Sequence, residues 1–206
     1  MSESPREHRL AVRRSARVFT LGGEAATEAW VALHGYGQLA GRFVRRFEQI
    51  AGPERLVVAP EALSRFYRQG GVGIVGATWM TREDREAEIR DYLGYLEQVR
   101  ATVIPPVPLT LLGFSQGVAT AARWAASGTA APKRLVCWGG LLPEDVPAAG
   151  LSALPVTFVV GDRDEWAPPE RVEEQAAALR AAGVSVEVVE FEGGHELNPE
   201  VLLSLV

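Results

Sequence analysis

Short, nearly continuous apolar runs recur along the chain, separated by longer amphipathic segments. Five of these runs occupy residues 29–33, 56–59, 109–112, 135–138 and 156–160. Apolar residues at every position of a short run are typical of strands buried on both faces, as in a parallel sheet. Apolar and polar residues alternate over 184–188, which predicts a further strand with one more exposed face. Residues 17–21 form a less regular candidate for an early strand.

Four segments between or after these runs have helical patterns. Apolar residues recur every three or four positions from Thr81 to about Ala101, which predicts an amphipathic helix. Further helices are predicted over the alanine-rich residues 116–127, over 168–182, where two prolines open the segment, and over 199–206. Strands that alternate with helices favour an α/β fold with a mostly parallel central sheet.

The length of 206 residues fits one domain, and no long polar linker divides the chain. We therefore expect a polar tail over residues 1–16 and a single domain over 17–206. The first 17 residues carry five arginines and two glutamates around no apolar core, so they are not expected to be a secretory signal. No apolar run approaches the roughly 20 residues that a membrane-spanning helix needs, so membrane insertion is not expected.

Charge and cysteine content exclude several classes of protein. The net charge of −5 argues against a broad nucleic-acid-binding surface. Cys137 is the only cysteine, which excludes an internal disulfide and a cysteine-based metal cage. These features favour a reducing, cytoplasmic compartment, and we expect Cys137 to be an inert buried thiol.

The most specific motif is Gly-Phe-Ser-Gln-Gly at 113–117, which joins the run 109–112 to the alanine-rich helix. A serine on such a sharp strand-to-helix turn needs strained backbone angles, and glycines on both sides relieve the crowding. The N-terminus of the following helix also stabilises developing negative charge. We therefore predict that Ser115 is a catalytic nucleophile; the alternative is a glycine-containing turn with an incidental serine.

A serine nucleophile needs a general base, and the chain has three histidines. His8 lies in the polar tail, and His34 ends a strand with no acid–base partner in view. His195 lies in a glycine-containing loop directly after the last predicted strand, where a base can reach the carboxyl edge of the sheet. We predict that His195 is the base; the alternative is a surface loop histidine.

The base needs a carboxylate to hold its tautomer. Three carboxylates follow the run 156–160: Asp162, Asp164 and Glu165. We predict Asp164, because the acid normally lies one short loop beyond the strand end, with Asp162 as the next candidate. Asp162 directly follows a glycine and is expected to accept hydrogen bonds from turn amides. The order serine, aspartate, histidine is that of α/β-hydrolases.

Charge stabilisation is the fourth element of such a site. His-Gly-Tyr-Gly at 34–37 follows the run 29–33, and its glycines allow the N–H of Tyr36 to point at an oxyanion. The N–H of Gln116, directly after the nucleophile, is the second predicted donor. The alternative for residues 34–37 is an ordinary turn at the end of a strand.

Together these motifs resemble the phospholipase/carboxylesterase family of α/β-hydrolases, which includes acyl-protein thioesterases, lysophospholipases and small bacterial carboxylesterases. The matching segments are 34–37, 76–80, 113–117, 161–164 with Pro168 beyond, and 193–196, so the resemblance spans roughly residues 29–206. It implies a three-layer α/β-hydrolase fold with helices on both faces of the sheet and no cap domain. It also implies cleavage of carboxylic esters or thioesters through an acyl-enzyme on Ser115, with no cofactor or metal.

The chain departs from the family pattern at two positions that bear on the substrate pocket. Gln38 stands where an acidic or polar residue usually follows the His-Gly-x-Gly segment, and Met80 stands where phenylalanine often follows the tryptophan. Phe66, Tyr67 and Trp79 are predicted contacts of the acyl group, with plain core packing as the alternative.

Two further patterns are discounted. Residues 71–76 match G-x-G-x-x-G, but no strand is predicted before them, so we interpret them as a flexible loop at the active-site cleft rather than a dinucleotide site. Arg42, Arg45 and Arg46 are interpreted as a solvated helix face, with a patch for an anionic substrate as the alternative.

The sequence therefore predicts a serine hydrolase acting on a small-molecule ester or thioester, with no nucleic-acid partner. Two alternatives remain at this stage: a peptidase or amidase that uses the same triad, and a non-catalytic binding protein on the same scaffold. The oligomeric state is open, with a homodimer as one alternative.

Overall fold

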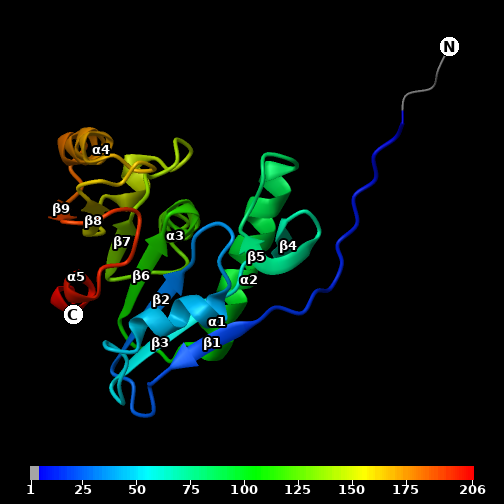
Figure 1. Cartoon of the computed structure of the whole chain (residues 1–206), viewed down its shortest axis with the longest axis horizontal. Coiled ribbons are helices and arrows are strands. Elements are labelled where there is room, and N and C mark those ends of the chain that lie inside the picture. Colours follow the sequence, from blue (N-terminus) through cyan, green and yellow to red (C-terminus); the bar gives the residue numbers. More distant parts are fainter. Residues whose placement is uncertain (1–4) are drawn as a thin grey trace.

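A seven-stranded sheet forms the centre of the computed structural model, which describes residues 5–206 (Figure 1). The strand order is β1-β3-β2-β6-β7-β8-β9. β1 runs antiparallel to β3 and the other strands are parallel to one another, as the sequence predicts. The bounds are β1 Val18–Leu21, β2 Glu28–Leu33, β3 Arg55–Pro60, β6 Leu109–Phe114, β7 Arg134–Trp138, β8 Val156–Gly161 and β9 Val186–Phe191.

Helices cover both faces of the sheet and complete three layers. One face carries α2 (Arg85–Val103), α3 (Gln116–Ala126), α4 (Pro169–Ala181) and the 3-10 turn η2 (Ala148–Leu151). The other carries α1 (Ala40–Phe43), the 3-10 turn η1 (Val44–Phe47) and α5 (Pro199–Ser204). Among residues 5–206, no helix combines the length and the apolar character needed to cross a bilayer.

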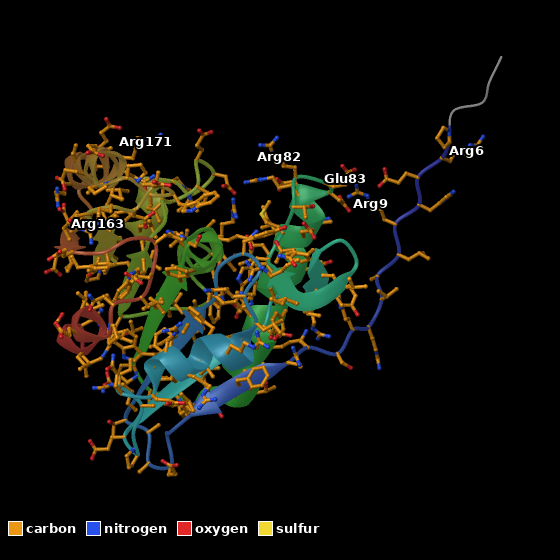
Figure 2. All side chains as sticks on the ribbon, viewed as in Figure 1. Arg6, Arg9, Arg82, Glu83, Arg163 and Arg171 are labelled. Atoms are coloured by element: carbon orange, nitrogen blue, oxygen red, sulfur yellow. The ribbon has the colours of Figure 1, made fainter. Side chains whose placement is uncertain are left out.

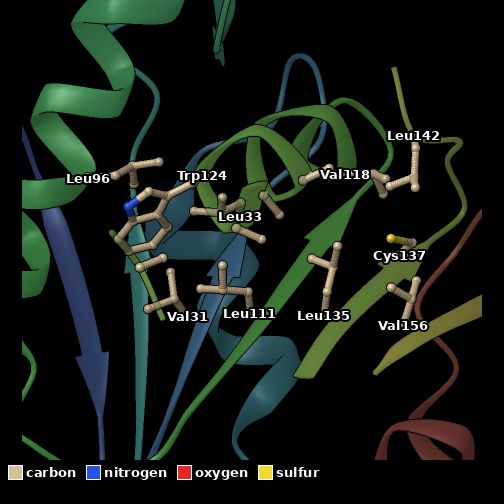
Figure 3. Close-up of a cluster of buried hydrophobic side chains, with 14 of the residues drawn as sticks. Val31, Leu33, Leu96, Leu111, Val118, Trp124, Leu135, Cys137, Leu142 and Val156 are labelled. Atoms are coloured by element: carbon tan, nitrogen blue, oxygen red, sulfur yellow. The ribbon is translucent and has the colours of Figure 1, made fainter. Parts of the chain in front are cut away.

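β2 shows why the strand sequences are apolar at successive positions. Val31 and Leu33 point into the larger core beneath α2 and α3 (Figure 3), whereas Trp30 and Ala32 point into the core on the opposite face. Successive side chains of a strand point to opposite faces, so a strand covered on both faces needs an apolar residue at each position. This physical requirement explains why the central strands could be predicted from sequence.

The predicted flexible loop over residues 71–76 is wrong. The structure has an antiparallel hairpin of β4 (Ser64–Gln69) and β5 (Val72–Thr78), separate from the main sheet. Gly70 and Gly71 form its turn with φ of 54° and 84°, values that glycine adopts readily. A strand therefore does precede residues 71–76, but no helix follows them, and a dinucleotide site needs that helix.

Two further segments, the long helix and the N-terminal tail, can be compared with their predicted bounds. α2 begins at Arg85 rather than Thr81, because Asp84 has a left-handed backbone with φ of 48°. Residues 5–16 of the expected tail contain no helix or strand, and the labelled Arg6 lies away from the domain in Figure 2. Arg9 contacts the domain through an ion pair with Asp84 at 2.8 Å. Residues 1–4 lie outside the described part of the chain.

His34, one of the three candidate bases, is fully buried at the end of β2. Its Nδ1 forms a 2.8 Å hydrogen bond with the carbonyl oxygen of Gly35, and its Nε2 forms a 3.0 Å hydrogen bond with the N–H of Ala62. Because a carbonyl only accepts and an N–H only donates, Nδ1 carries the proton and the ring is neutral. Burial lowers the pKa of His34. The residue therefore anchors the start of the 34–37 loop.

The turn between β6 and α3 packs directly on the end of β2. A Cβ built on Gly117 would overlap the carbonyl oxygen of Leu33, and one built on Gly113 would overlap that of Gly117. Glycine at both positions is thus required for close backbone approach, as the motif predicts.

We expect Gly117→Ala to lower the free energy of unfolding by about 3 kcal/mol, since the added methyl meets rigid backbone. Gly94→Ala is the matched control, because Gly94 lies within α2 and a Cβ there meets nothing within 4 Å. The control should gain about 0.5–1 kcal/mol from helix propensity. Urea denaturation measures both; equal stabilities for the two variants would contradict the close approach.

The lowered pKa of His34 predicts a pH dependence of stability. The unfolded ring titrates near 6.5 and the folded ring below that value, so the folded state binds fewer protons. The stabilisation is complete above about pH 6.5 and is lost as pH falls through the folded pKa. Urea denaturation at about pH 7.5 and about pH 5.5 should show this loss.

His34→Gln should flatten that dependence, whereas His8→Gln, in the exposed segment before β1, should leave it intact. An NMR titration of the wild-type imidazoles gives the folded pKa without a substitution. A His34 ring that titrates at or above its ordinary value would contradict the prediction.

Candidate active site

The strand order places the candidate site at the point where the sheet changes its winding direction. β2 and β6 are neighbours, and the chain continues from them toward opposite edges of the sheet. Ligands of open α/β sheets bind in the crevice at such a point, beyond the carboxyl ends of the strands. Leu33 pairs with Gly113, so both strands end at the same level, and a Cβ on Gly35 would lie 3.1 Å from the Cβ of Ser115.

Ser115 occupies the strained turn that its motif predicts. Its φ is 53° and its ψ is −119°, in a region that non-glycine residues rarely adopt. Its N–H bonds the carbonyl oxygen of Trp138 at 2.9 Å, and its own carbonyl accepts the N–H of Val118 at 2.9 Å. These bonds hold the turn, and the residue lines a cavity of about 460 Å³.

His195 and Asp164 form a hydrogen-bonded pair. The imidazole Nδ1 lies 2.8 Å from Oδ2 and 3.0 Å from Oδ1 of Asp164, whose side chain is buried. Oδ1 also accepts the N–H groups of Trp166 and Ala167 at 2.9 and 3.0 Å. With Nδ1 donating to the carboxylate, Nε2 is the unprotonated nitrogen of the neutral ring.

His195 and Ser115 line the same cavity, although within residues 5–206 the Ser115 hydroxyl has no hydrogen-bond partner. Nucleophile and base are often beyond hydrogen-bond distance in ligand-free active sites and approach when substrate binds. Since Ser115 and His195 share one cavity and His195 is hydrogen-bonded to Asp164, all three predicted triad residues lie at one edge of the sheet.

Asp162, the other candidate acid, has a different partner. Its Oδ1 accepts the N–H of Gly193 at 2.8 Å, which ties the loop that carries His195 to the end of β8. Its predicted bond to a backbone amide is present, and it does not contact the imidazole.

The two predicted oxyanion donors flank Ser115. In the part of the chain that the structure describes, neither the N–H of Tyr36 nor that of Gln116 donates a hydrogen bond. Gln116 begins α3, whose first N–H groups have no partner within the helix. Both amides are therefore available to an anionic oxygen at the nucleophile.

Hydrogen bonds from two neighbouring segments fix the loop that carries Tyr36. The Gln38 side chain accepts the N–H of Gly35 at 2.8 Å. Gly37 and Gln38 also pair with Ala77 of β5, at 2.8 and 3.0 Å. The hairpin thus holds the loop that carries Tyr36, a role that sequence reasoning missed because it did not predict the hairpin.

The Gln116 side chain clamps a further segment to the nucleophile turn. Its Oε1 accepts the N–H of Trp79 at 3.1 Å, and its Nε2 donates to the carbonyl of Met80 at 3.0 Å. Gln116 therefore has a backbone N–H that is free of other hydrogen bonds among the described residues, and a side chain that holds Trp79 and Met80 beside the turn.

The three predicted acyl contacts lie outside the cavity lining. Trp79 is 3% exposed and its indole N–H bonds the carbonyl of His34 at 2.8 Å, so it packs in the core. Phe66 stacks on Tyr36 with ring centroids 5.0 Å apart, and Tyr67 is exposed on β4. Tyr36, Ile74 and Val75 line the cavity instead.

The cavity carries positive charge, which the sequence indicated only as the alternative of an anionic-substrate patch over Arg42, Arg45 and Arg46. Arg42 and Arg46, from the predicted solvated face, line the cavity together with Arg68 of β4, whereas Arg45 does not. Among residues 5–206, no group of three or more histidine, cysteine, aspartate or glutamate side chains is arranged to hold a metal ion.

Solved structures with the same fold include several hydrolases, each less than 25% identical to the chain. Acyl-protein thioesterase 2 of Zea mays has a TM-score of 0.71 at 22% identity, and the alignment covers 93% of this chain and 96% of that one. A carboxylesterase from Mesorhizobium loti has a TM-score of 0.71 at 20% identity, with 92% of both chains covered.

A phospholipase/carboxylesterase from Dyadobacter fermentans has a TM-score of 0.63 at 19% identity, covering 95% of this chain and 96% of that one. The α/β-hydrolase fold predicted from the motifs is confirmed by these neighbours, which include the kinds of protein that the motifs resemble.

A search of curated proteins finds no match. The model of the family described as serine hydrolase (FSH1) matches residues 27–199. This match includes Ser115, Asp164 and His195. The chain therefore belongs to the FSH1 family of serine hydrolases.

Proposed function

We propose that this serine hydrolase cleaves carboxylic esters or thioesters through an acyl-enzyme on Ser115. The observation that carries the proposal is one cavity lined by a serine on a strained turn and by a histidine bonded to a buried carboxylate. Structural neighbours described as an esterase and a thioesterase domain support the same reaction class.

In the first step, His195 Nε2 takes the Ser115 proton as Oγ attacks the substrate carbonyl. Asp164 orients the imidazole and stabilises the imidazolium. The amides of Tyr36 and Gln116 bind the oxyanion, and collapse of the intermediate expels the alcohol or thiol with the proton from His195. Water activated by His195 then attacks the acyl-enzyme, which releases the acid and restores Ser115.

The cover and the lining of the cavity bear on the length and polarity of the acyl group. Among residues 5–206, no inserted domain covers the site, which favours short or flexible acyl groups. Ile74, Val75 and Phe114 supply apolar lining for the acyl group, and Phe66 acts indirectly by stacking on Tyr36.

We further propose that residues 17–206 act as one domain on a small-molecule substrate in the cytoplasm. The negative net charge disfavours nucleic acid as a partner. Cys137 is free and buried, and burial raises the pKa of its thiol, which keeps it in the unreactive protonated form.

Ser115→Ala should lower the rate of 4-nitrophenyl butyrate hydrolysis to about 10³–10⁴ times the uncatalysed rate, which is the residual acceleration from binding and the oxyanion donors alone. It should also abolish covalent labelling by a fluorophosphonate probe. Ser185→Ala, at an exposed position outside the cavity, should retain both the activity and the label. A wild-type rate in Ser115→Ala would overturn the nucleophile, and an unlabelled wild type would favour a non-catalytic binding protein.

Asp164→Asn should reduce kcat by about 10⁴-fold, because the amide no longer holds the required tautomer of His195. Asp162→Asn should cost less than about tenfold, since an amide oxygen still accepts the N–H of Gly193. Steady-state kinetics on the same ester measure both. The reverse ranking would assign the acid to Asp162.

Parallel assays on an ester, a thioester and an anilide with one acyl chain distinguish the candidate reactions. We expect cleavage of the ester and the thioester. Faster cleavage of the anilide would favour the peptidase or amidase alternative over the proposed function.

A further inference from the structure

Three arginines face the same cavity as Ser115 and His195. Arg42 comes from α1, Arg46 from η1 one turn later, and Arg68 from β4 of the hairpin. Arg68 lies over the oxyanion loop, because a Cβ built on Gly37 would be 3.4 Å from its Nε. Segments that are distant along the chain thus bring three guanidinium groups to the candidate nucleophile.

The neighbouring arginines on η1 and β4 form ion pairs with glutamates, whereas these three arginines do not. Arg45 pairs with Glu48 at 3.1 Å, and Arg65 pairs with the buried Glu61 at 2.9 Å. Over residues 5–206, Arg42, Arg46 and Arg68 have no carboxylate within ion-pair distance. On α1, η1 and β4, the arginines without a carboxylate partner are therefore the three that line the cavity.

The cavity is positive in a protein that is negative as a whole. Glu196 is the carboxylate among its described lining residues, against three arginines, while the whole chain carries a net charge of −5. A cleft lined by charges of one sign focuses the field and attracts ligands of the opposite sign. Guanidinium groups also match the geometry of carboxylate and phosphate oxygens.

Resting on the proposed function, we infer that the cavity binds a substrate carrying an anionic carboxylate or phosphate group besides its scissile ester or thioester. Arg42, Arg46 and Arg68 contact that group while the carbonyl lies at Ser115. The anion belongs either to the acyl chain or to the leaving group, and these two sources can be separated with matched substrates.

For the acyl chain, the pair is the mono-4-nitrophenyl ester of adipic acid and its methyl-capped neutral analogue. For the leaving group, the pair is the butyrate ester of 5-hydroxy-2-nitrobenzoate and 4-nitrophenyl butyrate. Inhibition of neutral-ester hydrolysis by inorganic phosphate, compared with acetate, tests phosphate as the bound anion. Each pair gives a ratio of kcat/KM for the anionic substrate to that for the neutral substrate.

We expect Arg46→Gln and Arg68→Gln each to lower that ratio by about tenfold or more in one of the two pairs. Arg45→Gln is the matched control, because Arg45 lies on the same 3-10 turn outside the cavity and should leave the ratio unchanged. Added salt should slow the anionic substrate more than the neutral one.

A ratio that both Arg46→Gln and Arg68→Gln leave unchanged in both substrate pairs, in an enzyme that hydrolyses the neutral esters, would overturn the anion site and leave the proposed function intact. An enzyme that hydrolyses neither member of either pair and resists the fluorophosphonate probe would contradict the proposed function itself.

Discussion

Direct backbone contact between the β6–α3 turn and the end of β2 is the constraint on which the site depends. Gly117 packs against the carbonyl of Leu33, and Gly35 packs against Ser115. Side chains at these glycines would separate Ser115 from the loop that carries Tyr36. Because the Gly117 contact involves backbone on both sides, it leaves little freedom to adjust, and it fixes the positions of Tyr36 and Gln116 relative to Ser115.

The central strands and the triad candidates could be predicted from sequence because local requirements determine them. β2 and its neighbours are covered on both faces, so their sequences are apolar throughout. Ser115 needs glycines around it, and these are visible in the sequence. The β4–β5 hairpin was missed because β4 is largely exposed and polar, which hides the alternation that predicts a strand. Its Gly70-Gly71 turn was the available signal.

Long-range contacts determine the rest, and local patterns do not report them. Trp79 matched an aromatic family segment, but its ring bonds the carbonyl of His34, 45 residues away, and is therefore buried. Arg42 and Arg46 were predicted on a solvated face, and Arg68 drew no interpretation. Only the packing of the hairpin beside α1 and η1 brings the three into one cavity.

Gln38 links the oxyanion loop to the charge of the cavity. The resembled family usually has an acidic or polar residue at this position, and here an amide oxygen accepts the N–H of Gly35. A carboxylate could accept the same bond but would add a negative charge to the lining, where Gln38 lies with Arg42, Arg46 and Arg68. The neutral side chain thus keeps the loop in place without offsetting the arginines. The neutral side chain at position 38 and the unpaired arginines therefore favour the same class of substrate.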